Sequence, residues 1–355
     1  MVRIVGIETS CDETAIGIVE GGRTILANAV ASSLELHRPY GGVIPEIAAR
    51  LHVETIWDVF SAALRDAKLS LSEIDGVAVT QGPGLPGALM IGVAFAKGLA
   101  LSLDRPLIPV DHLAAHLFAG EMTEPALEPP YIGLVVSGGH TLLCVVHADC
   151  RYELLGETHD DAVGEAFDKV AKLLGLGYPG GPAIDRLSTD AQGPRVTLPK
   201  THTKGAYDFS FSGLKTAVYH RVQDLVNQRP PREPREAGDG AAADGGGAGL
   251  DAGTVANVAA SFQEAAVDLL IQKTLRACQR TGMSRIVVGG GVASNRRLRA
   301  RFAEEASAKK LRVVFPPPTL CVDNGAMVAG IGFPLLQRGR VASLSLGIDS
   351  NLCLA

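Results

Sequence analysis

The chain has 355 residues, of which 46% are hydrophobic, 20% are charged and 5% are aromatic, and it contains 41 glycines. This composition favours an α/β protein with many tight loops over an all-β one, and the length suggests two or three domains. The formal net charge of −5 argues against a general nucleic-acid coat protein, because contacts to phosphates need Lys and Arg, although it leaves room for a local basic patch.

The N-terminal segment, residues 4–30, is expected to form three short strands. Its first part, IVGIETSCDETAIGIV at residues 4–19, consists of an apolar strand, a tight turn of small and polar residues and a second apolar strand. Backbone amides converge in such a turn and can hold a phosphate. Asp12 and Glu13 lie in the turn, so they are candidate acid–base groups facing a ligand, with turn capping as the alternative.

The next segment predicts a long helix over residues 48–67 and a buried strand over residues 74–80. The strand leads into QGPGLPGAL at residues 81–89, and an apolar helix of small residues is expected over residues 90–103. A glycine-rich loop that opens a helix directs backbone amides at an anion, because the N-terminal end of the helix dipole is positive.

A second segment of similar order begins near residue 108. Strands are expected over residues 131–157, where YIGLVVSGGHTLLCVV at residues 131–146 repeats the strand–turn–strand pattern of the N-terminus, and a helix is expected over residues 162–174. The repeat predicts a duplicated, two-lobed nucleotide-binding fold whose ligand lies in the cleft between the lobes.

A third glycine-rich loop, IVVGGGVASNRRLRAR at residues 286–301, predicts a buried strand, a loop and a helix. Its glycines allow the backbone to approach a ligand closely. The amide of Asn295 can donate and accept hydrogen bonds, as recognition of an adenosine or ribose edge requires. The alternative is that Asn295 caps the helix that starts at Arg296. The arginines of this helix are either contacts for an RNA backbone or a solvated helix face.

Residues 229–253 stand apart from the rest, because 16 of these 25 residues are Gly, Ala or Pro. The segment cannot bury much apolar surface, so we expect a low-complexity, flexible insertion between two helices. A long helix is expected over residues 255–281, a strand over residues 312–315 and a closing helix after Asp323.

His112 and His116 lie in the run DHLAAHLFAG. A spacing of four places both imidazoles on one helix face, one turn apart, where they can chelate a metal ion, with two unrelated polar residues as the alternative. Asp323 is a candidate third ligand, because it lies just beyond the expected strand at residues 312–315 and cleft residues follow strand ends. A zinc peptidase of the HExxH type needs a Glu beside the first His. HLAAH has none, so peptidase chemistry is disfavoured.

No run of about 18 apolar residues is apparent, so no membrane span is expected. No signal peptide is visible at the N-terminus. The six cysteines lack CxxC spacing and are expected to be reduced thiols. We therefore expect a cytoplasmic protein with no membrane partner.

Nine motifs together resemble the bacterial TsaD family, once labelled O-sialoglycoprotein endopeptidase. They are ETSCDET (8–14), HRPYGGVIPEIAARLH (37–52), GPGLPGAL (82–89), HLAAH (112–116), VVSGGHT (135–141), DDAVGEAFDKVAKLLGLGYPGGPAID (160–185), DFSFSGLKTAV (208–218), GGGVASN (289–295) and DNGAM (323–327). The resemblance covers the chain except for residues 229–253. The family often has Glu-Gly between the two histidines, where this chain has Ala114 and Ala115.

The resemblance implies a duplicated actin/Hsp70/sugar-kinase-like fold. The first lobe would span residues 1–108 and the second residues 109–323, with a helix at about 324–340 packing back on the first. The implied activity is that of an acyltransferase, which moves the threonylcarbamoyl group from threonylcarbamoyl-AMP to N6 of adenosine 37 in tRNAs reading codons that begin with A. The products are t6A and AMP. An actin-fold kinase, or a nucleotide-dependent scaffold without transferase activity, is the alternative.

The resemblance also implies the site residues. One Fe2+ per subunit would be held by His112, His116 and Asp323. Asp12 or Glu13 would orient or deprotonate the adenine amine, which is a poor nucleophile because its lone pair is delocalised into the ring. The acyl-adenylate, or an ATP- or AMP-like nucleotide, would contact Val135, Val136, Ser137, Gly138, Gly139, Asp168, Gly181, Asp185 and Asn295.

The partners implied by the resemblance are a tRNA anticodon loop, a paralogous scaffold subunit of the TsaB type and a small P-loop ATPase of the TsaE type. The apolar helix at residues 90–103 is either a surface for the paralogue or a buried helix within its lobe.

Overall fold

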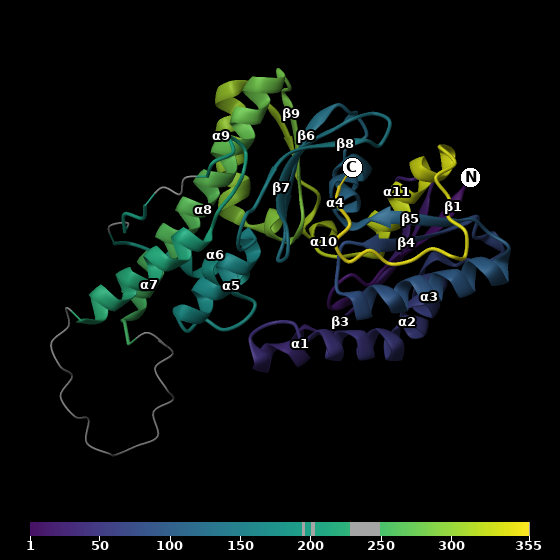
Figure 1. Ribbon diagram of the computed structural model, residues 1–355, viewed down its shortest axis with the longest axis horizontal. Coiled ribbons are helices and arrows are strands. Elements are labelled where there is room, and N and C mark those ends of the chain that lie inside the picture. The colour runs from purple at the N-terminus through teal and green to yellow at the C-terminus, as the bar shows by residue number, and fades with distance from the viewer. Residues whose placement is uncertain (194–195, 200–202, 228–248, 355) are drawn as a thin grey trace, which may run out of the picture.

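The computed structural model describes residues 1–193, 196–199, 203–227 and 249–354. Its framework is two five-stranded mixed sheets with helices on both faces of each (Figure 1). The strand order is β3-β2-β1-β4-β5 in the first sheet and β10-β9-β6-β7-β8 in the second. The strands are β1 (Arg3–Glu8), β2 (Glu13–Glu20), β3 (Thr24–Ser32), β4 (Gly76–Gly82), β5 (Leu107–Asp111), β6 (Tyr131–Val136), β7 (Thr141–Val146), β8 (Tyr152–Glu157), β9 (Arg285–Gly289) and β10 (Arg312–Val314).

The two sheets have the same connectivity. In each, three consecutive strands pair antiparallel, and the first of them also pairs in parallel with a later strand. A further parallel strand then completes the sheet, β5 beside β4 in one and β10 beside β9 in the other. The inner strands are buried along almost their whole length because both faces of each sheet are covered. The duplicated α/β fold predicted from the sequence is confirmed.

Two long helices cover the outer face of the first sheet. They are α2 (Pro45–Ala67) and α3 (Pro86–Leu103), and each begins with proline, whose fixed φ suits the first helical position. Ile56, Phe60 and Val93 from these helices pack on the sheet. Among the described residues, α3 is the one helix long and apolar enough to span a membrane, with a mean hydropathy of 1.6. The expectation that no such run exists was therefore wrong, although α3 packs against β4 and α2 here.

The other face of the first sheet is covered by α4 (His112–Thr123) and α11 (Gly325–Gln337), which lie between the two sheets. The return of α11 to the first sheet depends on glycine. A Cβ at Gly17 would overlap the backbone nitrogen of Ala326 and the carbonyl carbon of Gly325, so the helix backbone touches β2 directly. The division into lobes at residues 108 and 323 stays a prediction.

The outer face of the second sheet is covered by a second group of helices, whose apolar side chains form the largest core cluster. They are α5 (Val163–Leu173), α6 (Gly180–Leu187), α7 (Ser212–Asn227), α8 (Ala252–Thr281) and α9 (Arg296–Lys309). Two single-turn helices, α1 (Leu34–His37) and α10 (Pro318–Cys321), and the 3-10 turns η1 (Arg38–Tyr40), η2 (Leu71–Glu73), η3 (Ser188–Asp190) and η4 (Gly291–Ser294) complete the described elements.

The expected insertion at residues 229–253 falls mostly outside the described residues, which resume at residue 249. Its predicted end is too late. Leu250 is buried in the core of the second lobe, and Asp251 caps α8 by accepting a hydrogen bond from the backbone nitrogen of Thr254. The helix therefore starts at Ala252, because a capping Asp outweighs the glycine that follows it.

Candidate functional site

The predicted metal ligands come together at the junction of the two lobes. His112 and His116 lie on one side of α4, and their ring centroids are 4.6 Å apart. The helix starts at His112 because the carboxylate of Asp111 accepts hydrogen bonds from the backbone nitrogens of Leu113 and Ala114. Asp323 immediately precedes the cap of α11. Its Oδ1 lies 3.2 Å from Nε2 of His116 and 3.6 Å from Nε2 of His112.

This set of side chains fits a metal ion. The three potential ligand atoms lie within 4.8 Å of one another. Both ring nitrogens of His116 are buried and lack a well-formed hydrogen bond among the described residues, although Oδ1 of Asp323 lies 3.2 Å from Nε2. Such orphaned polar atoms are uncommon in a protein interior, and a cation bound to one of them would remove the cost. Two imidazoles and one carboxylate suit a first-row transition metal such as iron or zinc.

The three residues and their neighbours also shift one another's pKa values. Burial acts against a charge on His112, but the carboxylates of Glu8 and Asp323 outweigh it and raise the pKa of His112 to about 9. Burial likewise acts against the charge on Asp323, yet His112 and His116 lower its pKa to about 2. Burial lowers the pKa of His116. The protonated His112 and the carboxylates of Glu8 and Asp323 therefore form a buried group of opposite charges, and a metal ion that binds there displaces a proton from His112.

Sequence reasoning missed His140. It lies in the turn between β6 and β7, and burial followed by the charge of nearby His112 and His116 lowers its pKa to about 4. Its place in the motif VSGGHT was the only signal in the sequence.

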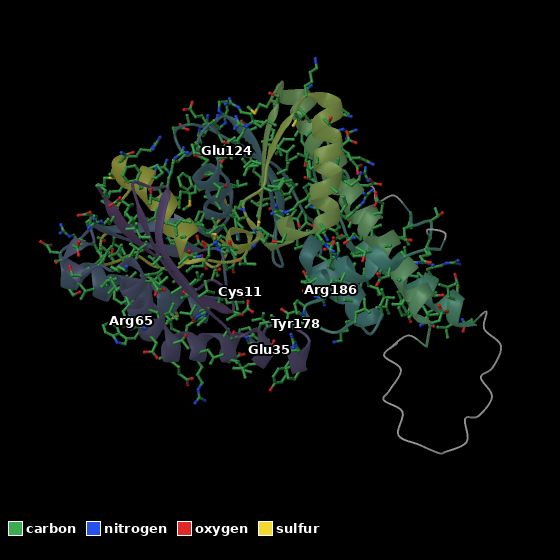
Figure 2. The ribbon with its side chains drawn as sticks, turned by 180° about the vertical axis from the view of Figure 1, so that it is seen from behind. Cys11, Glu35, Arg65, Glu124, Tyr178 and Arg186 are labelled. Carbon is green, nitrogen blue, oxygen red and sulfur yellow. The ribbon has the colours of Figure 1, made fainter. Side chains whose placement is uncertain are left out.

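A cavity of about 540 Å³ lies beside the metal centre, and both lobes contribute to its lining. Asp12 ends the turn between β1 and β2 and Glu13 begins β2, while Tyr178 comes from the loop before α6. Figure 2 shows Cys11, from the same turn as Asp12, facing Tyr178 across the gap. Val322, next to Asp323, also lines the cavity, so the metal centre and the cavity adjoin. The volume suits a nucleotide-sized ligand.

Most of the residues predicted to bind substrate line this cavity. They are Gly138, Asp168, Gly181, Asp185 and Asn295, together with the two acidic residues predicted to be catalytic, Asp12 and Glu13. Val135 and Val136 do not line it, because they belong to β6 and their side chains are fully buried in the two faces of the sheet. Ser137 and Gly139 flank Gly138 in the turn but are not part of the lining.

Asn295 has the capping role that the sequence left as the alternative, and it also lines the cavity. Its Oδ1 accepts a hydrogen bond of 2.9 Å from the backbone nitrogen of Leu298, and its Nδ2 donates one of 2.8 Å to Oε1 of Gln263. These two bonds fix which end of the amide is the oxygen. One N–H of Asn295 then remains for a ligand acceptor.

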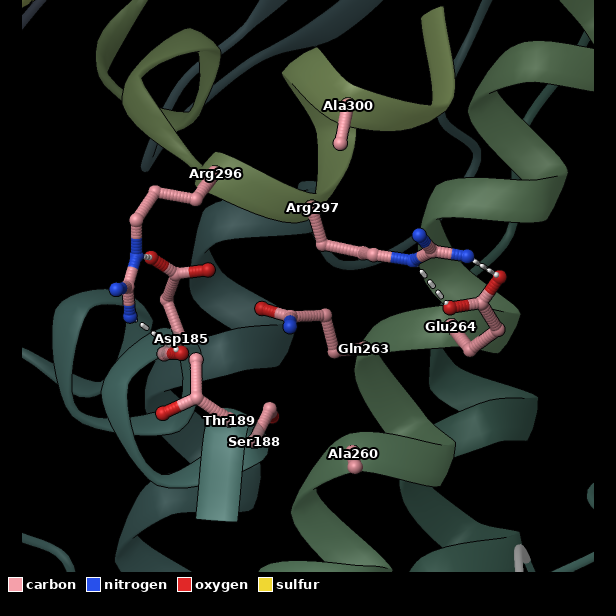
Figure 3. A pocket seen from close by; sticks show the side chains of 9 residues that line it. All are labelled: Asp185, Ser188, Thr189, Ala260, Gln263, Glu264, Arg296, Arg297 and Ala300. Atoms are coloured by element: carbon pink, nitrogen blue, oxygen red, sulfur yellow. Dashed lines mark hydrogen bonds and ion pairs between the residues drawn. The ribbon is translucent and has the colours of Figure 1, made fainter. Parts of the chain in front are cut away.

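The arginines at the start of α9 are held by partners within the chain. Figure 3 shows Arg296 directed toward Asp185 and Arg297 toward Glu264, around an adjoining cavity of about 220 Å³. Arg299 donates to the backbone oxygens of Ala293 and Pro316. Arg301 pairs with Glu264 and Asp268. The interpretation that these arginines are free to contact an RNA backbone is therefore not supported. Carboxylates and backbone carbonyls of neighbouring helices and loops already accept hydrogen bonds from their guanidinium groups.

The carboxyl group of Glu13 has an unusual environment. Burial, and then the negative charges of Asp323 and Asp12, raise its pKa to about 9. Its Oε1 accepts a hydrogen bond of 3.2 Å from the hydroxyl of Ser32. The burial and the nearby negative charges therefore favour the protonated form of this carboxyl group near pH 7.

Comparison with known proteins was made on the sequence and on the fold. The family model for TsaD, tRNA N6-adenosine threonylcarbamoyltransferase, matches residues 24–330. Proteins named tRNA N6-adenosine threonylcarbamoyltransferase from Staphylococcus aureus strains Newman and COL are 46% identical over 357 residues, which covers 99% of this chain and 97% of theirs.

The solved structures that resemble this fold are more distant. HypF from T. kodakarensis superposes with a TM-score of 0.59 at 15% identity, over 97% of this chain and 48% of HypF. Component A of (R)-2-hydroxyglutaryl-CoA dehydratase from Acidaminococcus fermentans superposes with a TM-score of 0.52 at 13% identity, over 94% of this chain and 98% of that one. These likenesses show the actin-like fold, and the predicted fold class is confirmed.

Proposed function

The chain belongs to the TsaD family of tRNA N6-adenosine threonylcarbamoyltransferases, and we propose that its metal centre and the adjoining cavity are the two halves of that transferase's active site. The enzyme transfers a threonylcarbamoyl group to N6 of adenosine in tRNA. The observation that supports our assignment of the site is the contact between the two halves. The lining of the cavity includes Asp12, Glu13, Asp185 and Asn295, and also Val322, the neighbour of Asp323 in the chain.

His112, His116 and Asp323 would hold one Fe2+ per subunit. The metal would supply Lewis acidity, which activates an acyl group toward attack by a weak nucleophile. In this arrangement both histidines come from one rigid helix, while the carboxylate comes from the segment before α11. The centre is therefore complete only when α11 is docked between the sheets.

The cavity would hold the AMP part of threonylcarbamoyl-AMP. The turn at Gly138 offers backbone amides to a phosphate, and a side chain at that position would meet nothing within 4 Å, so the backbone is open to a ligand. Asp185 and Asn295 would then contact the ribose or the base, one as an acceptor and the other as a donor. Val135 and Val136 would support this turn from within the sheet and make no ligand contact.

The acidic residues Asp12 and Glu13 would orient the incoming amine and take part in its proton transfer. N6 of adenine must lose a proton as it forms the new bond, and its lone pair must be turned toward the acyl carbon. Glu13, whose pKa is raised mainly by burial, would donate a hydrogen bond to an oxygen of the substrate. Asp12, which lines the same cavity, would orient the amine and accept its proton.

Several partners follow from this assignment. The tRNA anticodon loop must present adenosine 37 unstacked at the mouth of the cavity.

The adjacent helices α2 and α3 leave large apolar side chains exposed, with Val53, Trp57, Met90 and Leu101 each more than half exposed. An apolar surface of this kind marks a protein interface, so we place the TsaB-type paralogue there. We also propose that a small P-loop ATPase of the TsaE type is a partner and that the protein is cytoplasmic.

The experiment that tests this function is an assay of t6A in unmodified tRNA, with threonylcarbamoyl-AMP as donor and metal analysis of the same sample. We expect t6A formation that requires bound metal. ATP hydrolysis that proceeds without t6A and without metal would identify the protein as a nucleotide-dependent kinase or scaffold instead.

A further inference from the structure

Glu8, the last residue of β1, is a buried carboxylate that the proposed reaction does not use. Its side chain has no exposed area, and it lies at the end of the strand that leads into the acidic turn. Burying an ionised carboxylate costs several kcal/mol unless hydrogen bonds and an opposite charge compensate. The position therefore calls for a specific explanation.

The contacts of Glu8 account for both of its oxygens. Oε1 accepts a hydrogen bond of 2.6 Å from the backbone nitrogen of Ser10. Oε2 accepts one of 2.6 Å from the hydroxyl of Thr80 on β4, and it lies 3.0 Å from Nδ1 of His112. At that distance a proton lies between the imidazole and the carboxylate. Nδ1 of His112 is therefore the donor, and Nε2 is the nitrogen that faces Asp323.

We propose that Glu8 is a positioning residue for the metal centre, which fixes the tautomer and the ring orientation of His112 so that Nε2 presents its lone pair to a metal ion. This inference rests on the proposed metal centre. A carboxylate that accepts the second ring N–H of a ligating histidine is a recurring arrangement in metal sites, because it orients the ring and makes the imidazole a stronger ligand.

The two histidines then differ. Glu8 accepts the Nδ1 proton of His112, whereas Nδ1 of His116 has no hydrogen-bond partner among the described residues and Nε2 of His116 lies 3.2 Å from Oδ1 of Asp323. The hydroxyl of Ser10, 3.2 Å from Nδ1 of His112, supports the same ring. Because Glu8 and Thr80 belong to the first sheet, this contact also ties the start of α4 to that sheet.

Glu8→Gln is the sharpest test, because it keeps the shape of the side chain. The backbone N–H of Ser10 still needs an acceptor, so the amide oxygen takes the place of Oε1 and the amide NH2 takes the place of Oε2. His112 then faces a donor and must carry its proton on Nε2, which blocks the nitrogen needed for the metal. We expect Co2+ to bind the chelator-treated full-length chain about 10- to 100-fold more weakly, as read from its visible absorption.

Glu121→Gln is a matched control. Glu121 is a carboxylate near the other end of α4, where it accepts a hydrogen bond of 2.8 Å from the hydroxyl of Tyr131. This variant should bind Co2+ as the parent does. If Glu8→Gln does not fold, Glu8→Asp keeps the charge but draws the carboxylate back from Nδ1, and it should also weaken Co2+ binding.

Unchanged Co2+ affinity and spectrum in a folded Glu8 variant, alongside weakened binding in His116→Ala, would overturn the role of Glu8 and leave the metal centre standing. Unchanged binding in His116→Ala as well would overturn the metal centre itself, and the inference with it.

Discussion

Nε of Arg296 donates a hydrogen bond of 2.7 Å to Oδ2 of Asp185, and Nη2 of the same guanidinium donates one of 2.9 Å to the backbone oxygen of Asp185. The pair joins the first residue of α9 to α6 in the wall between the two cavities. Within the described part of the chain no hydrogen bond reaches Oδ1 of Asp185, so this oxygen is available to a ligand hydroxyl.

Arg296→Gln should therefore weaken AMP binding, because Asp185 loses the fork that orients it. The expected loss is about 1 kcal/mol, measured by titration calorimetry. Arg297→Gln is the control, since Arg297 pairs with Glu264 on the other side of the smaller cavity. An equal loss in both variants would show a general effect of removing positive charge. The analogue 2′,3′-dideoxy-AMP lacks both ribose hydroxyls. If Asp185 accepts a hydrogen bond from the ribose, the Arg296 and Arg297 variants should therefore bind this analogue equally well.

Asn295 performs two tasks that different substitutions can separate. Asn295→Ala removes both the cap of α9 and the amide donor, so it should lower the free energy of unfolding and weaken the free energy of AMP binding, each by about 1 kcal/mol. Asn295→Ser retains a side chain that caps helices well, so its melting temperature should stay close to that of the parent. Its AMP affinity should still be reduced, because the amide donor is gone. Normal AMP affinity in the Ser variant would restrict Asn295 to capping. Bound iron should not change in either.

The metal centre predicts a common result for three substitutions. His112→Ala, His116→Ala and Asp323→Ala should each abolish t6A formation and lower bound iron, measured by elemental analysis, because the two remaining ligands no longer define a site. His147→Ala is the control, since His147 follows the far end of β7 and its ring lies near Glu153. Full activity with normal iron in any of the three would remove that residue from the centre.

The raised pKa of Glu13 predicts a pH dependence with a definite sign. In the metal-free protein its pKa is about 9, against an ordinary value of 4.5. The folded state binds this proton more tightly than the unfolded chain, so the stabilisation is fully present below 4.5 and is lost as the pH rises through about 9. Glu13→Gln cannot lose that proton. Its melting temperature relative to the parent should rise between pH 6 and pH 9, roughly the window of the shift, and a constant difference would contradict the assignment.

The docking of α11 can be tested through Gly17. Gly17→Ala places a methyl group against the backbone of Gly325 and Ala326, which cannot rotate away, so it should destabilise the fold by about 1–3 kcal/mol in denaturant titrations. Gly98→Ala is the control. Gly98 is exposed in α3 with no atom within 4 Å of a new Cβ, so alanine there should stabilise the helix by up to about 1 kcal/mol.

The sequence by itself determined the features that depend on local geometry. The repeated strand–turn–strand pattern predicted the duplicated sheets, because apolar strands and small-residue turns are local signals. The spacing of His112 and His116 placed both rings on one helix face, because one turn of a helix has a fixed size. The bounds of the elements were less accurate, since capping residues such as Asp251 decide where a helix begins.

Only the tertiary structure decided which charged and polar groups meet. Arg296 gave no sign in the sequence that it pairs with Asp185, nor Glu8 that it supports His112, because each partner lies on an element far along the chain. The same motif that predicted a ligand contact at Val135 and Val136 placed them inside a sheet covered on both faces. Burial and pairing depend on how helices and sheets pack, and packing brings together residues that no local pattern relates.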